Sequence, residues 1–282
     1  MVPEIDDEEK KKEYLAILAV FERFLDERDE LEEPWEIMEE LIALRAEFAI
    51  HHAIKGFGME WDDALELVRS NLNTLPELDR ARADILIASI NNLVEFAAAE
   101  EYQMMSEADD VNDEESDNED EDEKRELLIS VCKKYNSQYA NVENLDIEYA
   151  MMIADALVVI PADASLMYMT QGDERVRPWH LQFEGFTAPK SRFPAWLIPP
   201  IEHQCRCYLV EVDDASFKIG DVKNEIVRLP SMPEWFNPTF KESVALGGRI
   251  FSDDHPYFQV NIEDVPQLWD IVERIKAKYL NG

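Results

Sequence analysis

Cysteine is scarce in this chain of 282 residues, which contains only three. Small secreted domains that depend on disulfides carry a denser set, so we expect a reducing, cytosolic environment and no disulfide framework. Cys205 and Cys207 are separated by a single residue, which is too close along one strand for them to pair with each other. Cys132 stands alone in a helical pattern and is expected to be a small core residue.

The chain also has no long apolar run, and no signal peptide is expected from its first residues. No stretch reaches the roughly 18 apolar residues that a membrane-spanning helix needs. The start of the chain, MVPEIDDEEKKKEY, lacks the basic and then apolar layout of a signal peptide. Since 46% of the residues are hydrophobic, we expect a sizeable core. Because no apolar run is long enough to span a bilayer, we expect no membrane partner.

Basic residues are few compared with acidic ones, 27 against 62, and the formal net charge is −35. Residues 1–124 contain 39 acids and 11 bases, a net −28, whereas residues 125–282 contain 23 acids and 16 bases, a net −7. Such an N-terminal part repels nucleic acid, so direct nucleic-acid binding by it is not expected. A solvated surface is the favoured interpretation, and docking onto a basic partner or mimicry of DNA charge is the alternative.

Apolar residues recur at helical spacing in four N-terminal segments, with prolines near the start of two of them. The expected helices cover residues 8–32, 34–54, 59–72 and 76–105. Their short connections predict an acidic, antiparallel helical bundle over residues 1–105. His51 and His52 lie in the second helix without an acid three or four residues later, so we expect ordinary helix residues rather than metal ligands.

A strongly acidic segment follows at residues 106–124, with 12 acids, one lysine and no aromatic residue. It cannot bury enough apolar surface to offset the entropy lost on ordering, so we predict an acidic disordered linker. A calcium-binding loop is not expected, because the segment lacks the mid-loop glycine of that motif.

Strands and helices are mixed in the last part of the chain, residues 125–282. Helical patterns cover 125–157 and 264–279, and strand patterns occur in SLMYMT, CRCYLVEV and NEIVRLP, at 165–170, 205–212 and 224–230. The fold class expected for the whole chain is therefore α+β, with a small sheet confined to this C-terminal domain.

Four nitrogen and sulfur groups suggest a metal site. Along an extended strand, His203, Cys205 and Cys207 share one face, and His180 ends the preceding charged loop. Together they supply the four ligands of a tetrahedral zinc site, although the H-x-C-x-C spacing is tighter than the usual cysteine pairs. The alternative is that the cysteines are buried hydrophobes and the histidines hydrogen-bond to carboxylates such as Asp173.

The loop before His180 reads QGDERVRPW and contains Asp173, Glu174, Arg175 and Arg177. Arginine pairs with carboxylates through two parallel hydrogen bonds, so this loop is interpreted as a structural staple for an irregular fold. The alternative is catalytic, with Asp173 or Glu174 as a base beside His180 or an arginine as an anion clamp. No phosphate-binding glycine loop, G-x-S-x-G or HExxH accompanies it.

Three motifs in order, GDERVRPWH, EGFTAPK and a tryptophan with two prolines followed by CRC, resemble the phage Mu protein F-like head-morphogenesis domain. The resemblance covers residues 166–213, and a weaker one covers 232–258, where WFNP is similar to a downstream element of the family. The acidic N-terminal bundle has no counterpart in this resemblance.

The resemblance implies a minor head protein of a tailed phage or prophage, acting without catalysis in capsid assembly and found in the virion head or, during assembly, in the host cytoplasm. Its implied partners are the portal and capsid proteins. Some family members have cysteines where this chain has Arg177 and His180, which resembles a zinc knuckle with varying ligands. His255 is a spare candidate ligand, although a loop histidine capped by Asp253 or Asp254 is the favoured interpretation.

Two other functions remain open. A virion-delivered effector or toxin-type enzyme would use Glu242, Asp253, Asp254 and His255, the acids and histidine worth testing after residue 214. An acidic decoy would use the N-terminal bundle to occupy a basic surface on a DNA-binding protein.

Overall fold

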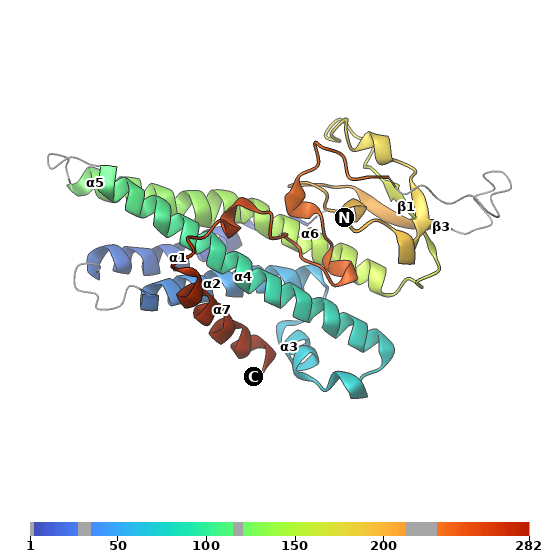
Figure 1. Cartoon of the computed structure of the whole chain (residues 1–282), viewed down its shortest axis with the longest axis horizontal. Helices are drawn as coiled ribbons and strands as arrows, with labels where there is room; N and C mark the ends of the chain where they lie inside the picture. The colour runs from blue at the N-terminus through green and yellow to red at the C-terminus, as the bar shows by residue number, and fades with distance from the viewer. Residues whose placement is uncertain (1–2, 28–34, 115–120, 213–229, 282) are drawn as a thin grey trace.

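Long helices build most of the molecule, and a small sheet lies at one end of them (Figure 1). The computed structural model describes residues 3–27, 35–114, 121–212 and 230–281. The helices and their bounds are α1 Asp7–Glu27, α2 Trp35–Gly56, α3 Trp61–Arg69, α4 Glu77–Glu114, α5 Glu121–Lys133, α6 Ala140–Val158 and α7 Val265–Leu280. None of the helices in these ranges combines the length and hydropathy that a bilayer-spanning segment needs.

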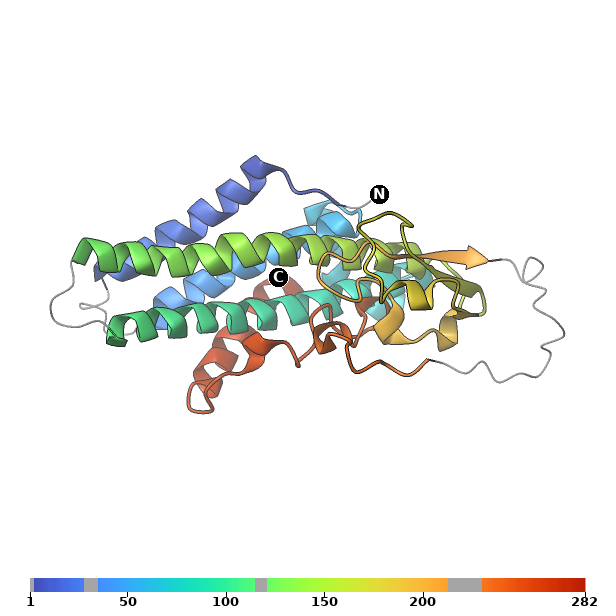
Figure 2. The same ribbon diagram turned by 90° about the horizontal axis from the view of Figure 1, so that it is seen from above.

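The central bundle is made by α1, α2, α4 and the continuous rod of α5 and α6 (Figure 2). A π-helical turn, Lys134–Tyr139, joins α5 to α6 without breaking the rod. The four predicted N-terminal helices are thus present, and α1 buries Ile17, Val20, Phe21 and Phe24. Acidic first turns at α1 and α3 favour these starts, because negative charge is stabilised by the N-terminal end of a helix dipole.

One hydrophobic core runs through the bundle and into the C-terminal part. Leu41 of α2, Leu93 of α4 and Ile147 of α6 are all completely buried in it. Because α6 packs directly on α2, the core continues across the boundary expected between residues 105 and 125. The two regions therefore share one interior.

The acidic segment 106–124 is largely helical, so the prediction of a disordered linker is wrong for most of it. Residues 106–114 extend α4 and residues 121–124 begin α5; residues 115–120 lie outside the described part. Packing explains the difference, because Ala108 is buried, and Glu107 accepts hydrogen bonds from Lys134 and Tyr135 of the neighbouring rod. Tertiary contact thus overrides an unfavourable composition.

The sheet has three antiparallel strands in the order β2-β1-β3, with bounds Thr187–Pro189, Ser165–Met169 and Tyr208–Val212. The register places Met167 of β1 opposite Thr187 of β2 and Val210 of β3. Leu166 and Tyr168 of β1 are fully buried. A small antiparallel sheet beside many helices confirms the α+β class.

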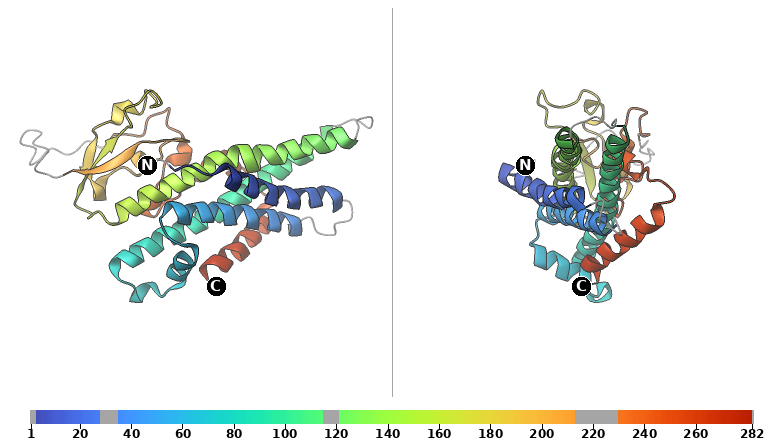
Figure 3. Two further views of the ribbon diagram at one scale, coloured as in Figure 1. Left: turned by 180° about the vertical axis from the view of Figure 1, so that it is seen from behind. Right: turned by 90° about the vertical axis from the view of Figure 1, so that its left-hand side faces the viewer.

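Of the three predicted strands, one begins later than expected and another lies almost entirely outside the described residues. The strand at CRCYLVEV begins only at Tyr208, so the cysteines precede it, and NEIVRLP falls almost entirely outside the described residues. The predicted C-terminal helix is present as α7, which crosses the bundle next to α2 and α4 (Figure 3). It buries Leu268, Ile271 and Ile275, as its spacing predicts.

Candidate metal centre

The backbone turns sharply at Gln204, between His203 and Cys205. Gln204 has φ 57°, in the left-handed region that residues other than glycine rarely adopt. Its backbone N–H donates to Oδ1 of the buried Asp146, on α6, at 2.6 Å, which holds the turn in place. Side chains before and after Gln204 therefore do not follow the alternation of an extended strand.

His203 points away from the cysteines because of this turn. Its Nδ1–H donates to Asp146 Oδ2 at 2.8 Å, and its ring packs edge-on against Phe240. The expectation that His203 shares a ligand face with Cys205 and Cys207 is wrong, since the assumed extended conformation is absent. The alternative from the sequence, a histidine bonded to a carboxylate, describes His203, with Asp146 in place of Asp173.

His180, Cys205 and Cys207 do converge. His180 Nδ1 lies 3.4 Å from Cys207 Sγ and 3.9 Å from Cys205 Sγ, and all three residues are buried. Their donor atoms all lie within 4.8 Å of one another. A tetrahedral zinc ion with Zn–N of about 2.1 Å and Zn–S of about 2.3 Å places N and S about 3.6 Å apart. The two observed N···S distances bracket that value.

Glu202 holds the other side of the His180 ring. Its Oε2 accepts from His180 Nε2–H at 3.1 Å, and the same oxygen accepts from Trp179 Nε1–H at 3.0 Å. Arg177 Nε lies 3.3 Å from it. With Nε2 protonated and engaged, the Nδ1 lone pair faces the sulfur atoms, as in the carboxylate–histidine–metal arrangement of many metal sites.

The chemistry of the cluster also fits a bound cation. The Tyr168 hydroxyl is buried without a conventional hydrogen-bond partner, yet it lies close enough to Cys207 to lower the pKa of that thiol. The largest contribution to the lowered pKa of Cys207 is its hydrogen bond with Cys205, whereas burial raises the pKa of Cys205. A thiolate at Cys207 would give the Tyr168 hydroxyl an acceptor, so the residues present can hold a soft metal ion.

The charged loop is tied to the same turn. Asp173 accepts two parallel hydrogen bonds from the Arg206 guanidinium, at 2.7 and 2.8 Å, and Arg177 donates to the His203 carbonyl at 2.8 Å. The hydrogen bonds from Arg206 hold the pKa of Asp173 below its usual range. Glu174 and Arg175 are exposed. These contacts join the loop to the residues flanking Cys205, and among the described residues neither Asp173 nor Glu174 hydrogen-bonds to His180.

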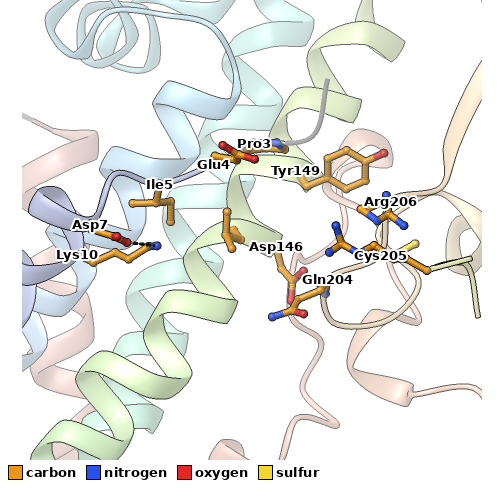
Figure 4. A pocket seen from close by; sticks show the side chains of 12 residues that line it. Pro3, Glu4, Ile5, Asp7, Lys10, Asp146, Tyr149, Gln204, Cys205 and Arg206 are labelled. Atoms are coloured by element: carbon orange, nitrogen blue, oxygen red, sulfur yellow. Dashed lines mark hydrogen bonds and ion pairs between the residues drawn. The ribbon is translucent and has the colours of Figure 1, made fainter. Parts of the chain in front are cut away.

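A cavity of about 750 Å³ opens beside this turn (Figure 4). The N-terminal residues before α1 line one side, α6 lines the floor, and the loop residues line the other side. Its lining includes Glu4, Asp146, Arg175, Gln204 and Cys205. Acidic and basic groups are balanced around it, so its charge selects no ligand class.

The residues considered for an effector enzyme lie elsewhere, and each is bonded to a neighbour outside this set of four. Lys241 Nζ contacts both Asp253 and Asp254 at 2.8 Å, and Glu242 Oε2 accepts from the Arg249 backbone. His255 is buried, its Nδ1 accepts from the Tyr257 N–H, and burial lowers its pKa to about 4. His255 does not join the cysteine cluster, and these four residues do not converge on one site.

Three participants were not identified from the sequence: Glu202, Tyr168 and Asp146. Glu202 belongs to the same IEHQCRC segment, so the sequence places it near the cysteines. The sequence does not show that its side chain points toward His180. Asp146 and Tyr168 come from α6 and β1, and no local spacing links them to the turn.

No known protein family, curated protein or solved structure matches this chain. The likeness of residues 166–213 to the Mu F-like domain therefore depends on the motif residues themselves, and on whether those residues form one unit in space.

Proposed function

We propose that this chain is a phage or prophage minor head protein that acts in capsid assembly without catalysis. Residues 166–213 would be its head-morphogenesis module, docking on portal or capsid proteins. Zinc held by His180, Cys205 and Cys207 would fix the shape of that module. The observation that carries the proposal is that the first and third motifs meet at the His180–Cys205–Cys207 cluster, while the second motif supplies a strand of the adjoining sheet.

The contacts between the motifs support this interpretation. GDERVRPWH reaches CRC through the Asp173–Arg206 pair and through His180. EGFTAPK contributes β2, which pairs with β1. Trp196, from the third motif, packs edge-on against Phe183 with ring centres 5.3 Å apart. Segments spread over residues 172–207 thus form a single unit, as expected if they are parts of one domain signature.

Zinc is the metal that the donor set favours. One imidazole nitrogen and two thiol sulfurs suit a borderline-soft ion, whereas magnesium and calcium prefer oxygen ligands. The protein offers three donors, and a fourth position would go to water or to a partner group.

The proposal is tested by asking whether the chain enters phage particles. The full-length, tagged protein would be expressed during lytic growth of its parent phage, and procapsids and virions would be purified and analysed by mass spectrometry. We expect the chain in procapsids together with the portal protein. Its absence from both particles, with the protein present in the lysate, would contradict the assembly role while leaving the metal question untouched.

A matched pair of variants links the module to that role. Cys205→Ser/Cys207→Ser removes two donors, whereas Cys132→Ser changes a cysteine that is equally buried but outside the cluster. We expect the double variant to be lost from particles and the single variant to be retained. If both variants enter the particles as well as the wild type does, the cysteine cluster is not needed for assembly.

A further inference from the structure

The interior of the bundle contains three carboxyl groups around a single guanidinium. Arg45 of α2 donates to Glu100 Oε2 at 2.7 Å and to Glu143 Oε2 at 3.1 Å, and to Asn144 at 3.0 Å. Glu101 lies next to Glu100 on α4 and is equally buried. All of these side chains are almost completely removed from solvent, so one positive charge faces three acids.

Several polar atoms in this group have no partner. Glu100 Oε1, Glu101 Oε1 and Asn136 Oδ1 are buried and unbonded, and the described residues contain only two further side-chain atoms of this kind. An ionised carboxylate with an unsatisfied oxygen is costly in a low-dielectric interior, and it becomes tolerable when a proton or a cation is added. Asn136 comes from the π-helical turn, a distortion often found at functional sites.

A metal ion fits this group poorly. Within the described ranges, the sets of three or more metal-binding side chains with converging donor atoms do not include Glu100, Glu101 or Glu143. Arg45 already stands where a cation would neutralise Glu100 and Glu143. Moreover, Glu100 and Glu143 accept hydrogen bonds from the same guanidinium, so two buried acids share one positive charge.

We propose that the bundle core is a proton-binding site, in which Glu101 and one member of the Glu100–Glu143 pair are neutral carboxylic acids at neutral pH. A neutral carboxyl group gains an O–H donor, which can satisfy one of the unpartnered oxygens of its neighbours. The site leaves one net carboxylate opposite Arg45 and so balances the buried charge. This inference is independent of the proposed head-assembly role.

The groups that face these glutamates are Arg45 from α2, Glu143 and Asn144 from α6, Tyr135 and Asn136 from the π-helical turn, Cys132 from α5, and Tyr257 from the segment before α7. Burial raises the pKa of Glu101 to about 8, since the opposing effects of Arg45 and Asn136 are smaller. Burial likewise raises the pKa of Glu100 well above its usual range.

The consequence is a stability that falls as pH rises. A carboxyl whose pKa is higher in the folded than in the unfolded chain keeps its proton on folding, so the folded state binds the extra proton between the two pKa values. For Glu101 that window runs from its ordinary 4.5 to about 8. Within it, the unfolding equilibrium constant increases about tenfold per pH unit for each such proton.

The test compares the full-length chain with Glu101→Gln, which mimics the neutral acid and cannot ionise. Urea unfolding would be followed at about pH 6 and about pH 8.5, with the exposed Glu126→Gln as control. We expect Glu101→Gln to be more stable than the wild type at the higher pH and to lose part of the pH dependence. The control should follow the wild type at both values.

Two outcomes would overturn the inference. One is a loss of stability in Glu101→Gln that is equal at both pH values, which would mean that the native residue is ionised. The other is a metal ion that is retained by Cys205→Ser/Cys207→Ser and lost on Glu101→Gln. If Glu101→Gln does not fold, infrared spectroscopy of the wild type decides: the carbonyl band of a buried neutral carboxyl group must be present at neutral pH, and its absence contradicts the proposal.

Discussion

Glu202 accepts a hydrogen bond from His180 Nε2 at 3.1 Å, on the opposite side of the ring from the two cysteines. This contact selects the tautomer and the orientation of the imidazole. Because Nε2 carries the proton, Nδ1 is left to face Cys207 and Cys205. A residue of the turn thus prepares a residue of the charged loop for metal binding.

Glu202 should therefore contribute to metal affinity without being a ligand. Outer-shell partners of this kind typically change metal affinity by about 10- to 100-fold. We expect Glu202→Ala to weaken zinc binding by that amount, measured by competition with a chromophoric chelator. Glu202→Gln, which keeps an oxygen acceptor, should lose less.

Glu174→Gln is the control for that experiment, because Glu174 is an exposed acid of the same charged loop. It should leave zinc affinity unchanged. If Glu174→Gln and Glu202→Ala weaken binding equally, the effect is one of general charge and the positioning role of Glu202 is wrong.

The left-handed turn at Gln204 gives a second prediction. Proline fixes φ near −65° and has no N–H, so Gln204→Pro removes both the turn and the bond to Asp146. We expect it to abolish metal binding and to cost about 3 kcal/mol or more in the free energy of unfolding. Calorimetry and metal analysis would measure the two effects.

Gln204→Gly serves as the companion variant, because glycine adopts positive φ without steric cost. It should keep the metal and change stability by no more than about 1 kcal/mol in either direction. Metal binding that survives Gln204→Pro would show that the turn is not needed to bring Cys205 to His180.

His52 links three helices and should be charged in the folded chain. Its Nδ1 lies 2.6 Å from Glu148 Oε1 and its Nε2 lies 3.0 Å from Glu13 Oε1, so both nitrogens can donate only in the imidazolium form. Burial alone would lower the pKa of His52, but the hydrogen bonds to Glu13 and Glu148 raise it above its ordinary value. His52→Leu should cost about 3 kcal/mol, the lower end for breaking a buried ion pair, because Glu148 keeps Lys55 and Glu13 keeps Asn144 as partners.

The pH dependence follows from the raised pKa. The stabilisation by His52 is complete below its ordinary pKa of 6.5 and is lost as pH rises through the higher folded-state pKa. Chemical unfolding over this range should show a penalty for His52→Leu that shrinks at high pH. His51→Leu, at the exposed neighbouring position, should stay within about 0.5 kcal/mol of the wild type at every pH.

Much of the helical architecture could be predicted from apolar spacing, because periodicity reports directly on which face is buried. The convergence of His180 with Cys205 and Cys207 was also accessible, since these residue types are rare in the chain. The position of His203 could not be predicted, because the left-handed backbone at Gln204 breaks the alternation of side chains that an extended strand would have. Nothing in the local pattern marks that residue as left-handed.

The buried ion pairs of His52 and Arg45 could not be predicted from the sequence for a different reason. His52 finds its acids on α1 and α6, and Arg45 finds its acids on α4 and α6, so no search within one helix could pair them. The acidic segment at 106–124 was misjudged in the same way. Its composition favours disorder, but contacts with the rod of α5 and α6 fold its first nine residues into α4.

The most direct test of the account is the metal content of the full-length protein, purified without chelator and measured by mass spectrometry. The whole chain is needed, because the core beneath the module is shared with the N-terminal helices. Wild type and Cys132→Ser should carry one zinc per chain, and Cys205→Ser/Cys207→Ser should carry none and unfold at a lower temperature. A metal-free wild type whose stability is unchanged in the double variant would contradict the account, and would leave the arginine–carboxylate contacts to hold the module.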